Sequence, residues 1–169
     1  MDAPFAGVLE RSPGPPGPAK DRVGGVEAGS IAPMDVLLVS QDEDTRDQMA
    51  LVVRSIERRI GEDLRFRAAR NGELGAKAAF RDRPDVIVAD EIATRAGAFG
   101  LARTLRDALD PYTGVIVILL ERKHDAWLAR WSGADAWFVK PVDPFELADR
   151  LLELVTDRKS EPKSDKERV

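Results

Sequence analysis

The sequence contains no cysteine, a single histidine and no long apolar run. The absence of cysteine excludes disulfides, thiolate catalysis and cysteine-based metal sites. No apolar run approaches the ~18 residues that a membrane span needs, and the amino terminus lacks a basic segment followed by an apolar core. We therefore expect a cytoplasmic protein that does not associate with membranes.

The excess of acidic over basic residues is also small. The formal net charge is -4 over 169 residues, and no long block of like charges occurs. A balanced surface of this kind argues against nucleic-acid binding. The 43% hydrophobic content is sufficient for one full-sized core, so we expect a single domain.

The motifs of common α/β enzymes are missing as well. No glycine-rich phosphate loop follows any predicted strand, which argues against a Rossmann or P-loop enzyme. No nucleophile, base and orienting group occur together, so we do not expect an enzyme. His124 lies in a charged loop without a spaced partner, and a lone loop histidine is usually solvated rather than catalytic or metal-binding.

Composition divides the chain into three parts. Residues 1–33 are rich in proline and glycine, which neither complete a strand ladder nor fill a core, so we predict a disordered arm. Residues 34–156 alternate apolar and amphipathic runs and form the predicted domain. Residues 157–169 alternate charged and polar side chains and are predicted to be a disordered tail.

Within the domain, five strand-like runs alternate with helix-like runs. This order is typical of a flavodoxin-like fold, in which a doubly wound parallel sheet carries helices on both faces. The strands are expected at residues 36–39, 64–69, 86–90, 114–120 and 136–139. The second strand is the most polar of them, which places it at a sheet edge.

The helices follow from the 3.6-residue period and from their terminal residues. One continuous helix is predicted from about residue 45 to Gly61, and a later one with Leu101, Leu105 and Leu109 on its buried face. The last helix is predicted to start at Asp143, because proline follows the cap and glutamate lies in the first turn.

The central strand, Val86–Asp90, is continuously apolar and ends on an acid. Such a run is typical of a strand buried on both faces, with Asp90 at the carboxyl edge of the sheet. Right-handed crossovers place the first strand beside the third, which opens a crevice above their ends. Ser40, Gln41 and Asp90 are expected in this crevice, with Lys140 close by from the fifth strand.

Two motifs resemble the receiver domains of two-component response regulators. The strand Val86–Asp90, with Gly100 ten residues later, is similar to the strand that presents the family's phosphorylated aspartate. The stretch Gly133–Pro141, GADAWFVKP, is similar to the strand, switch aromatic and Lys-Pro pair that close the family's site. The resemblance covers about residues 34–156 and implies a flavodoxin-like fold.

The resemblance also implies roles for individual residues. In the family an acidic pair after the first strand holds Mg²⁺, and the central aspartate, here Asp90, accepts the phosphoryl group. The lysine, here Lys140, balances the phosphoryl charge, and a Ser or Thr at the end of the fourth strand binds that group. Positioning and charge neutralisation are what phosphoryl transfer requires.

This sequence departs from the family at the metal and hydroxyl positions. The acidic pair aligns with Ser40 and Gln41, which bring no negative charge, so Mg²⁺ affinity should fall steeply. Asp42 and Glu43 follow directly and could substitute as metal ligands. The Ser or Thr position falls on a leucine, Leu119 or Leu120, which cannot hydrogen-bond a phosphoryl oxygen.

Asp90 and Lys140 also have a purely structural interpretation. Two opposite charges ~4 Å apart at an effective dielectric of about 20 attract by roughly 4 kcal/mol before desolvation. Such a pair persists without any phosphate. We therefore expect no cofactor, and Mg²⁺ only if phosphorylation is retained.

The three tryptophans, Trp127, Trp131 and Trp137, all belong to the fourth predicted helix and the fifth strand. The family's switch aromatic aligns with Trp137, and this face carries partner contacts in receiver domains. Aromatic side chains are favoured interface anchors, but core packing explains them equally well at this stage. A symmetric homodimer through the tryptophans is also compatible with the sequence.

The resulting hypothesis is an atypical, stand-alone receiver domain, or pseudo-receiver, in a phosphorelay. It would bind a histidine kinase, a phosphotransfer protein or another signalling protein through the tryptophans, with weak or no phosphorylation. A first alternative keeps Asp90 as a working phosphoacceptor from a histidine kinase. A second alternative is a flavodoxin-like domain that binds a small anion near Lys140.

Overall fold

Five parallel strands form the centre of the computed structural model, which describes residues 32–91 and 97–161. The strand order is β2-β1-β3-β4-β5, and every neighbouring pair is parallel. The strands are β1 (Met34–Val39), β2 (Leu64–Ala69), β3 (Val86–Asp90), β4 (Val115–Leu120) and β5 (Ala136–Val139). This topology confirms the predicted flavodoxin-like doubly wound sheet, with β1 beside β3 and β2 at an edge.

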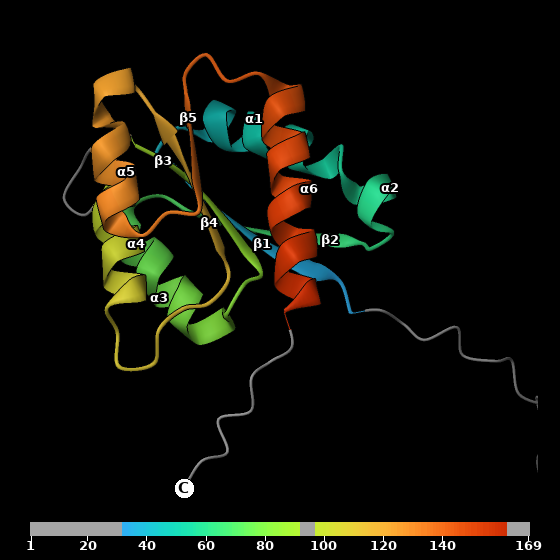
Figure 1. The fold of residues 1–169 in the computed structure, drawn as a ribbon, viewed down its shortest axis with the longest axis horizontal. Coiled ribbons are helices and arrows are strands. Elements are labelled where there is room, and N and C mark those ends of the chain that lie inside the picture. The colour runs from blue at the N-terminus through green and yellow to red at the C-terminus, as the bar shows by residue number, and fades with distance from the viewer. Residues whose placement is uncertain (1–31, 92–96, 162–169) are drawn as a thin grey trace, which may run out of the picture. The chain divides into compact units, whose positions relative to one another are not determined.

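Helices cover both faces of the sheet. Figure 1 shows α1 and α6 on one side of the strands and α3, α4 and α5 on the other. The helices are α1 (Glu43–Arg54), α2 (Glu57–Ile60), α3 (Gly72–Asp82), α4 (Ala98–Arg106), α5 (Ala126–Ser132) and α6 (Pro144–Ser160); a 3₁₀ turn, η1 (Lys123–Asp125), precedes α5.

The two layers bury alternate residues of each strand. In β3, Val86 and Val88 pack in the core under α1 and α6, whereas Ile87 and Ala89 pack in the core under α3, α4 and α5. Successive side chains of a strand point to opposite faces, so a strand covered on both faces must be apolar at every position. This packing explains the continuous apolar runs of β3 and β4.

The predicted continuous helix before Gly61 is interrupted, and this prediction was wrong. α1 ends at Arg54, and α2 begins only at Glu57. At the break, the Ser55 hydroxyl donates to Val52 O at 2.6 Å, and Ile56 N donates to Val53 O at 3.1 Å. Serine side chains compete for backbone carbonyls in this way, and the tighter three-residue bonds end a regular α-helix.

The inward position predicted for Leu109 was also wrong. α4 ends at Arg106, and Leu109 is 108% exposed. Beyond the helix end, Tyr112 N donates to Leu105 O at 2.9 Å, and the buried Tyr112 packs in the core under α3, α4 and α5. The helix-like spacing of leucines in the sequence therefore extends beyond the last helical residue.

The last helix ends four residues beyond residue 156, where the domain was predicted to end. α6 runs to Ser160, so residues 157–160 of the predicted tail are helical. Arg158 Nη2 donates to Asp135 Oδ1 at 2.7 Å, and Lys159 forms an ion pair with Glu62, which ties the final turn to the rest of the domain. Most of the predicted arm, residues 1–31, and the tail from residue 162 lie outside the described residues.

Within residues 32–91 and 97–161, no helix has the length and apolarity required to cross a membrane.

Candidate functional site

The carboxyl ends of β1, β3 and β4 bring three residues together. Ser40 directly follows β1, Asp90 ends β3, and Leu119 is the register partner of Asp90 on β4. Residues at the same register in neighbouring parallel strands point to the same face. Leu119 belongs to the core under α1 and α6, so Asp90 faces that layer. The predicted approach of Ser40 and Asp90 is present in the structure.

Asp90 is the centre of this arrangement and has a fully buried side chain, with 0% exposed. Ser40 Oγ donates to Asp90 Oδ2 at 3.0 Å, and Lys140 Nζ forms an ion pair with Asp90 Oδ1. The carboxylate is thus compensated by one hydroxyl on Oδ2 and one ammonium group on Oδ1.

Lys140 directly follows β5 and lies between two carboxylates. Its Nζ contacts Asp90 Oδ1 and Glu121 Oε1. Burial by itself would lower the pKa of the Lys140 ammonium, but the hydrogen bonds to Asp90 and Glu121 outweigh this effect and raise the pKa. Lys140 therefore stays charged, as a counter-ion of Asp90 must.

Ser40 is held in place through its backbone as well as its hydroxyl. Its N donates to Ala69 O at 3.1 Å, and its O accepts a hydrogen bond from Arg46 Nη1 at 2.6 Å. The hydroxyl oxygen also accepts from Asp42 N at 3.2 Å while its hydrogen is donated to Asp90. The hydroxyl thus links the start of α1 to the end of β3.

The residues at the expected metal position do not fit a Mg²⁺ ion. Ser40 is neutral and already donates to Asp90, and the neutral Gln41 is exposed. Asp42 caps α1 and accepts from Thr45 N at 3.0 Å and from Thr45 Oγ1; these hydrogen bonds hold the pKa of Asp42 below its ordinary value. Glu43 is exposed in the first turn of α1.

The wider surroundings agree with this conclusion. In the described part of the chain, no group of three or more histidine, aspartate or glutamate residues is arranged to hold a metal ion. Mg²⁺ usually takes one or two protein carboxylates together with waters, and of Ser40, Gln41 and Asp90 only Asp90 has a carboxylate. We therefore derive no chemical step through a metal.

Leucine replaces the hydroxyl residue beside Asp90. Leu119 pairs in register with Asp90, whereas Leu120 belongs to the core on the opposite face. The structure thus places Leu119, rather than Leu120, next to the Asp90 carboxylate. Its apolar side chain offers no hydrogen bond to an oxyanion.

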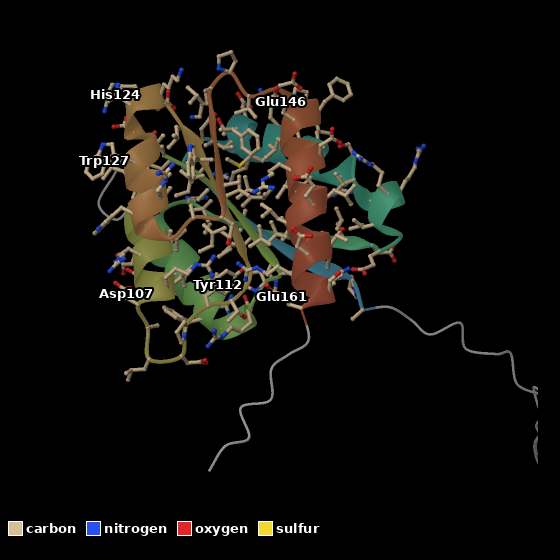
Figure 2. All side chains as sticks on the ribbon, in the orientation of Figure 1. Asp107, Tyr112, His124, Trp127, Glu146 and Glu161 are labelled. Carbon is tan, nitrogen blue, oxygen red and sulfur yellow. The ribbon has the colours of Figure 1, made fainter. Side chains whose placement is uncertain are left out.

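The three tryptophans differ in their surroundings. Trp127 and Trp131 of α5 are 64% and 54% exposed, and Figure 2 shows Trp127 pointing away from the sheet. Trp137 is half-buried against the core under α3, α4 and α5. Core packing therefore accounts for Trp137 alone, and two large apolar rings remain on the surface of α5.

Arginines lie over two of these rings. The Arg103 guanidinium of α4 is 5.0 Å from the Trp131 ring centroid, and that of Arg130 is 5.7 Å from the Trp137 ring centroid. Cation–π contacts of this kind order the rings without burying them. The exposed surface around Trp127 and Trp131 is therefore both aromatic and basic.

His124 belongs to η1 and lies at the outer side of the domain, as Figure 2 shows. Its side chain is largely exposed, and its Nε2 is 3.9 Å from Asp125 Oδ1. The surroundings are those of a solvated loop histidine.

One site residue, Glu121, was missed by sequence reasoning. It is the first residue after β4 and forms the second ion pair of Lys140. Its place directly after a strand, at the same sheet edge as Asp90 and Lys140, is a signal that could have identified it.

Two curated relatives align with 70–75% of this chain. No protein-family model matches the chain. An uncharacterized response regulatory protein of Mycobacterium tuberculosis is 31% identical over 129 residues, which cover 75% of this chain and 94% of that protein. An uncharacterized 14.6 kDa protein of Leptolyngbya boryana is 28% identical over 120 residues, 70% of this chain and 87% of that protein.

Solved structures agree with the fold. The receiver domain of a signal transduction histidine kinase from Syntrophus aciditrophicus has a TM-score of 0.65 at 20% identity and covers 80% of this chain and 99% of its own. The receiver domain of a Pseudomonas aeruginosa sensor histidine kinase, with a magnesium ion in its active site cleft, has a TM-score of 0.63 at 20% identity, covering 74% and 99%. With its sheet order, its Asp90–Lys140 pair and its mycobacterial relative, this chain belongs to the response-regulator receiver family of two-component signalling.

Proposed function

We propose that this protein is an atypical receiver domain that acts in two-component signalling through protein–protein contacts, with weak or no phosphorylation of Asp90. The observation that carries the proposal is the environment of Asp90. Its side chain is fully buried and is compensated by Ser40 and Lys140, while neutral residues occupy the metal position. A phosphoryl group would find neither a metal nor a hydroxyl at Leu119 to stabilise its charge.

The partner surface that we propose is formed by Trp127 and Trp131, with Trp137 beneath it. Exposed tryptophans are typical anchors of protein interfaces, and the Trp131 ring is already held by a cation–π contact with Arg103. A histidine kinase, a phosphotransfer protein, another signalling protein or a second copy of the chain is the kind of partner proposed. This function requires no cofactor and no enzymatic step, and we place it in the cytoplasm.

The test uses the tryptophans as reporters. Purified protein is titrated with Mg²⁺, alone and with beryllium fluoride as an acyl-phosphate mimic, and Trp emission is followed. We expect no saturable change at millimolar Mg²⁺. A variant carrying Ser40→Asp and Gln41→Asp restores two carboxylates and should gain a Mg²⁺-dependent response. A saturable change in the unmodified protein that is lost in Asp90→Asn would contradict the proposal.

One observation favours the alternative in which Asp90 accepts a phosphoryl group. Lys140 Nζ contacts Asp90 Oδ1 and is in place to balance a phosphoryl charge. This alternative predicts Mg²⁺-dependent labelling by a phosphodonor that disappears in Asp90→Asn. The proposed function instead predicts partner binding that Asp90→Asn leaves unchanged.

A further inference from the structure

We propose that Glu121 is a positioning residue that holds Lys140 across Asp90 and thereby limits access of small anionic reagents, such as phosphoryl donors, to the Asp90 carboxylate. This inference rests on the proposed function, because it supplies a physical cause for weak phosphorylation. It concerns a residue outside the motifs that identify the family in this sequence.

The three side chains form a graded series from the interior to the surface. The Asp90 side chain is 0% exposed, that of Lys140 is 24% exposed, and that of Glu121 is 48% exposed. Lys140 Nζ contacts both carboxylates. Lys140 therefore lies between Asp90 and the Glu121 carboxylate, and the outer ion pair must break before Lys140 can move outward.

The backbones of both outer residues are fixed, so this bridge does not depend on mobile loops. Glu121 N donates to Glu91 Oε2 at 2.7 Å, and Glu91 directly follows Asp90. Lys140 N donates to Leu120 O at 2.9 Å, which extends the pairing of β4 and β5 to the lysine. With both main chains held at adjacent strand ends, the Glu121 carboxylate stays within reach of Lys140.

The negative charge around Lys140 should also limit the access of anions to Asp90. Lys140 alone neutralises Asp90, so the carboxylate of Glu121 leaves one excess negative charge at the surface of the pair. Glu91 and Asp125 add further carboxylates close by, and Arg122 pairs with Asp125 through Nε at 3.0 Å. An excess of negative charge at the entrance disfavours the approach of an anion.

The test measures access to Asp90 directly. Wild-type protein and Glu121→Gln are treated with N-ethyl-5-phenylisoxazolium-3′-sulfonate, a carboxylate reagent whose reactive form carries a negative sulfonate, and the rate of enol ester formation at Asp90 is measured by peptide mass spectrometry. We expect labelling to rise about two- to fivefold in Glu121→Gln, the change that loss of one exposed ion pair produces. Raising the ionic strength should increase labelling more in the wild type than in Glu121→Gln, because salt screens the exposed pair that only the wild type has.

Glu153→Gln is the matched control, because Glu153 also forms an exposed pair, with Arg150 at 2.8 Å on α6. It should leave Asp90 labelling unchanged. Equal Asp90 labelling in wild type and Glu121→Gln, or a salt response in the variant as large as in wild type, overturns the inference. A saturable response of the wild type to beryllium fluoride and Mg²⁺ overturns the proposed function instead, so the two failures are distinguishable.

Discussion

Ser40 is a hydrogen-bond partner of Asp90 at the end of β1. Its Oγ donates to Asp90 Oδ2 at 3.0 Å and accepts from Asp42 N at 3.2 Å. Ser40→Ala removes both bonds inside a buried site and should lower the free energy of unfolding by about 1–3 kcal/mol. Urea denaturation measures this loss. Ser160→Ala removes an exposed hydroxyl bond to Thr156 O and should change stability by less than about 0.5 kcal/mol.

Glu91 makes stability depend on pH. Burial raises the pKa of Glu91 above its ordinary value of 4.5, an effect opposed by the bond from Glu121 N and reinforced by the charge of Asp125. A raised pKa in the folded protein means that the contribution of Glu91 is fully present below pH 4.5 and is lost as pH rises through the folded pKa.

Glu91→Gln removes this titration and keeps an oxygen that can accept from Glu121 N. We therefore expect the variant to gain stability relative to wild type as pH increases from below 4.5 to neutral. Urea denaturation at the two pH values measures the difference. A difference between the two proteins that does not change with pH would show that Glu91 is no more buried in the folded state than in the unfolded one.

At the scale of elements, α4 shows how a hydrophobic period differs from a packed helix face. Leu105 is fully buried, whereas Leu109, four residues later, lies beyond the helix end and is fully exposed. Leu105→Ala should cost about 2–5 kcal/mol of unfolding free energy, because it leaves a cavity between α4 and the sheet. Leu109→Ala should cost less than about 0.5 kcal/mol.

Both variants are measured by thermal and urea denaturation against the same wild type. A large loss in Leu109→Ala would mean that α4 extends past Arg106 in solution. At this helix end, Arg106 donates from Nε to Gly133 O at 3.0 Å and from Nη2 to Asp135 Oδ2 at 2.7 Å. These partners come from a distant part of the sequence.

At the scale of the whole molecule, the tryptophans distinguish surface from core. Trp127→Ala and Trp131→Ala should each change the unfolding free energy by less than about 0.5 kcal/mol, because both rings are mostly exposed. Trp137→Ala removes a half-buried ring and should cost about 1–3 kcal/mol. Equal losses at all three positions would contradict the exposed placement of α5.

Sedimentation velocity on the same samples tests the homodimer. Dimer formation by wild type that Trp127→Ala and Trp131→Ala abolish would assign this surface to a second copy of the chain. A monomer in every sample would direct the search to a heterologous signalling partner. Binding hot spots are concentrated in exposed aromatic anchors, so either partner should be weakened most by these two substitutions.

The sequence by itself determined the sheet and its central acid. The apolar runs of β3 and β4 require burial on both faces, and chain order with right-handed crossovers then places Asp90 and Ser40 at one edge. Whether a segment forms a strand follows from its local composition and from the spacing of its apolar residues, which is why the five strands were predictable. The cap at Asp143 was predictable for the same local reason.

Tertiary structure alone decided the side-chain environment of the site and the helix ends. The ion pair of Lys140 with Glu121 and the register that sets Leu119 beside Asp90 depend on contacts between segments distant in sequence. The position of Leu109 beyond the end of α4 was likewise visible only in the structure. The hydrophobic pattern of a sequence shows which residues are apolar. It does not show where a helix ends or which charged side chains form ion pairs. Those outcomes are fixed only when the sheet brings the strand ends together.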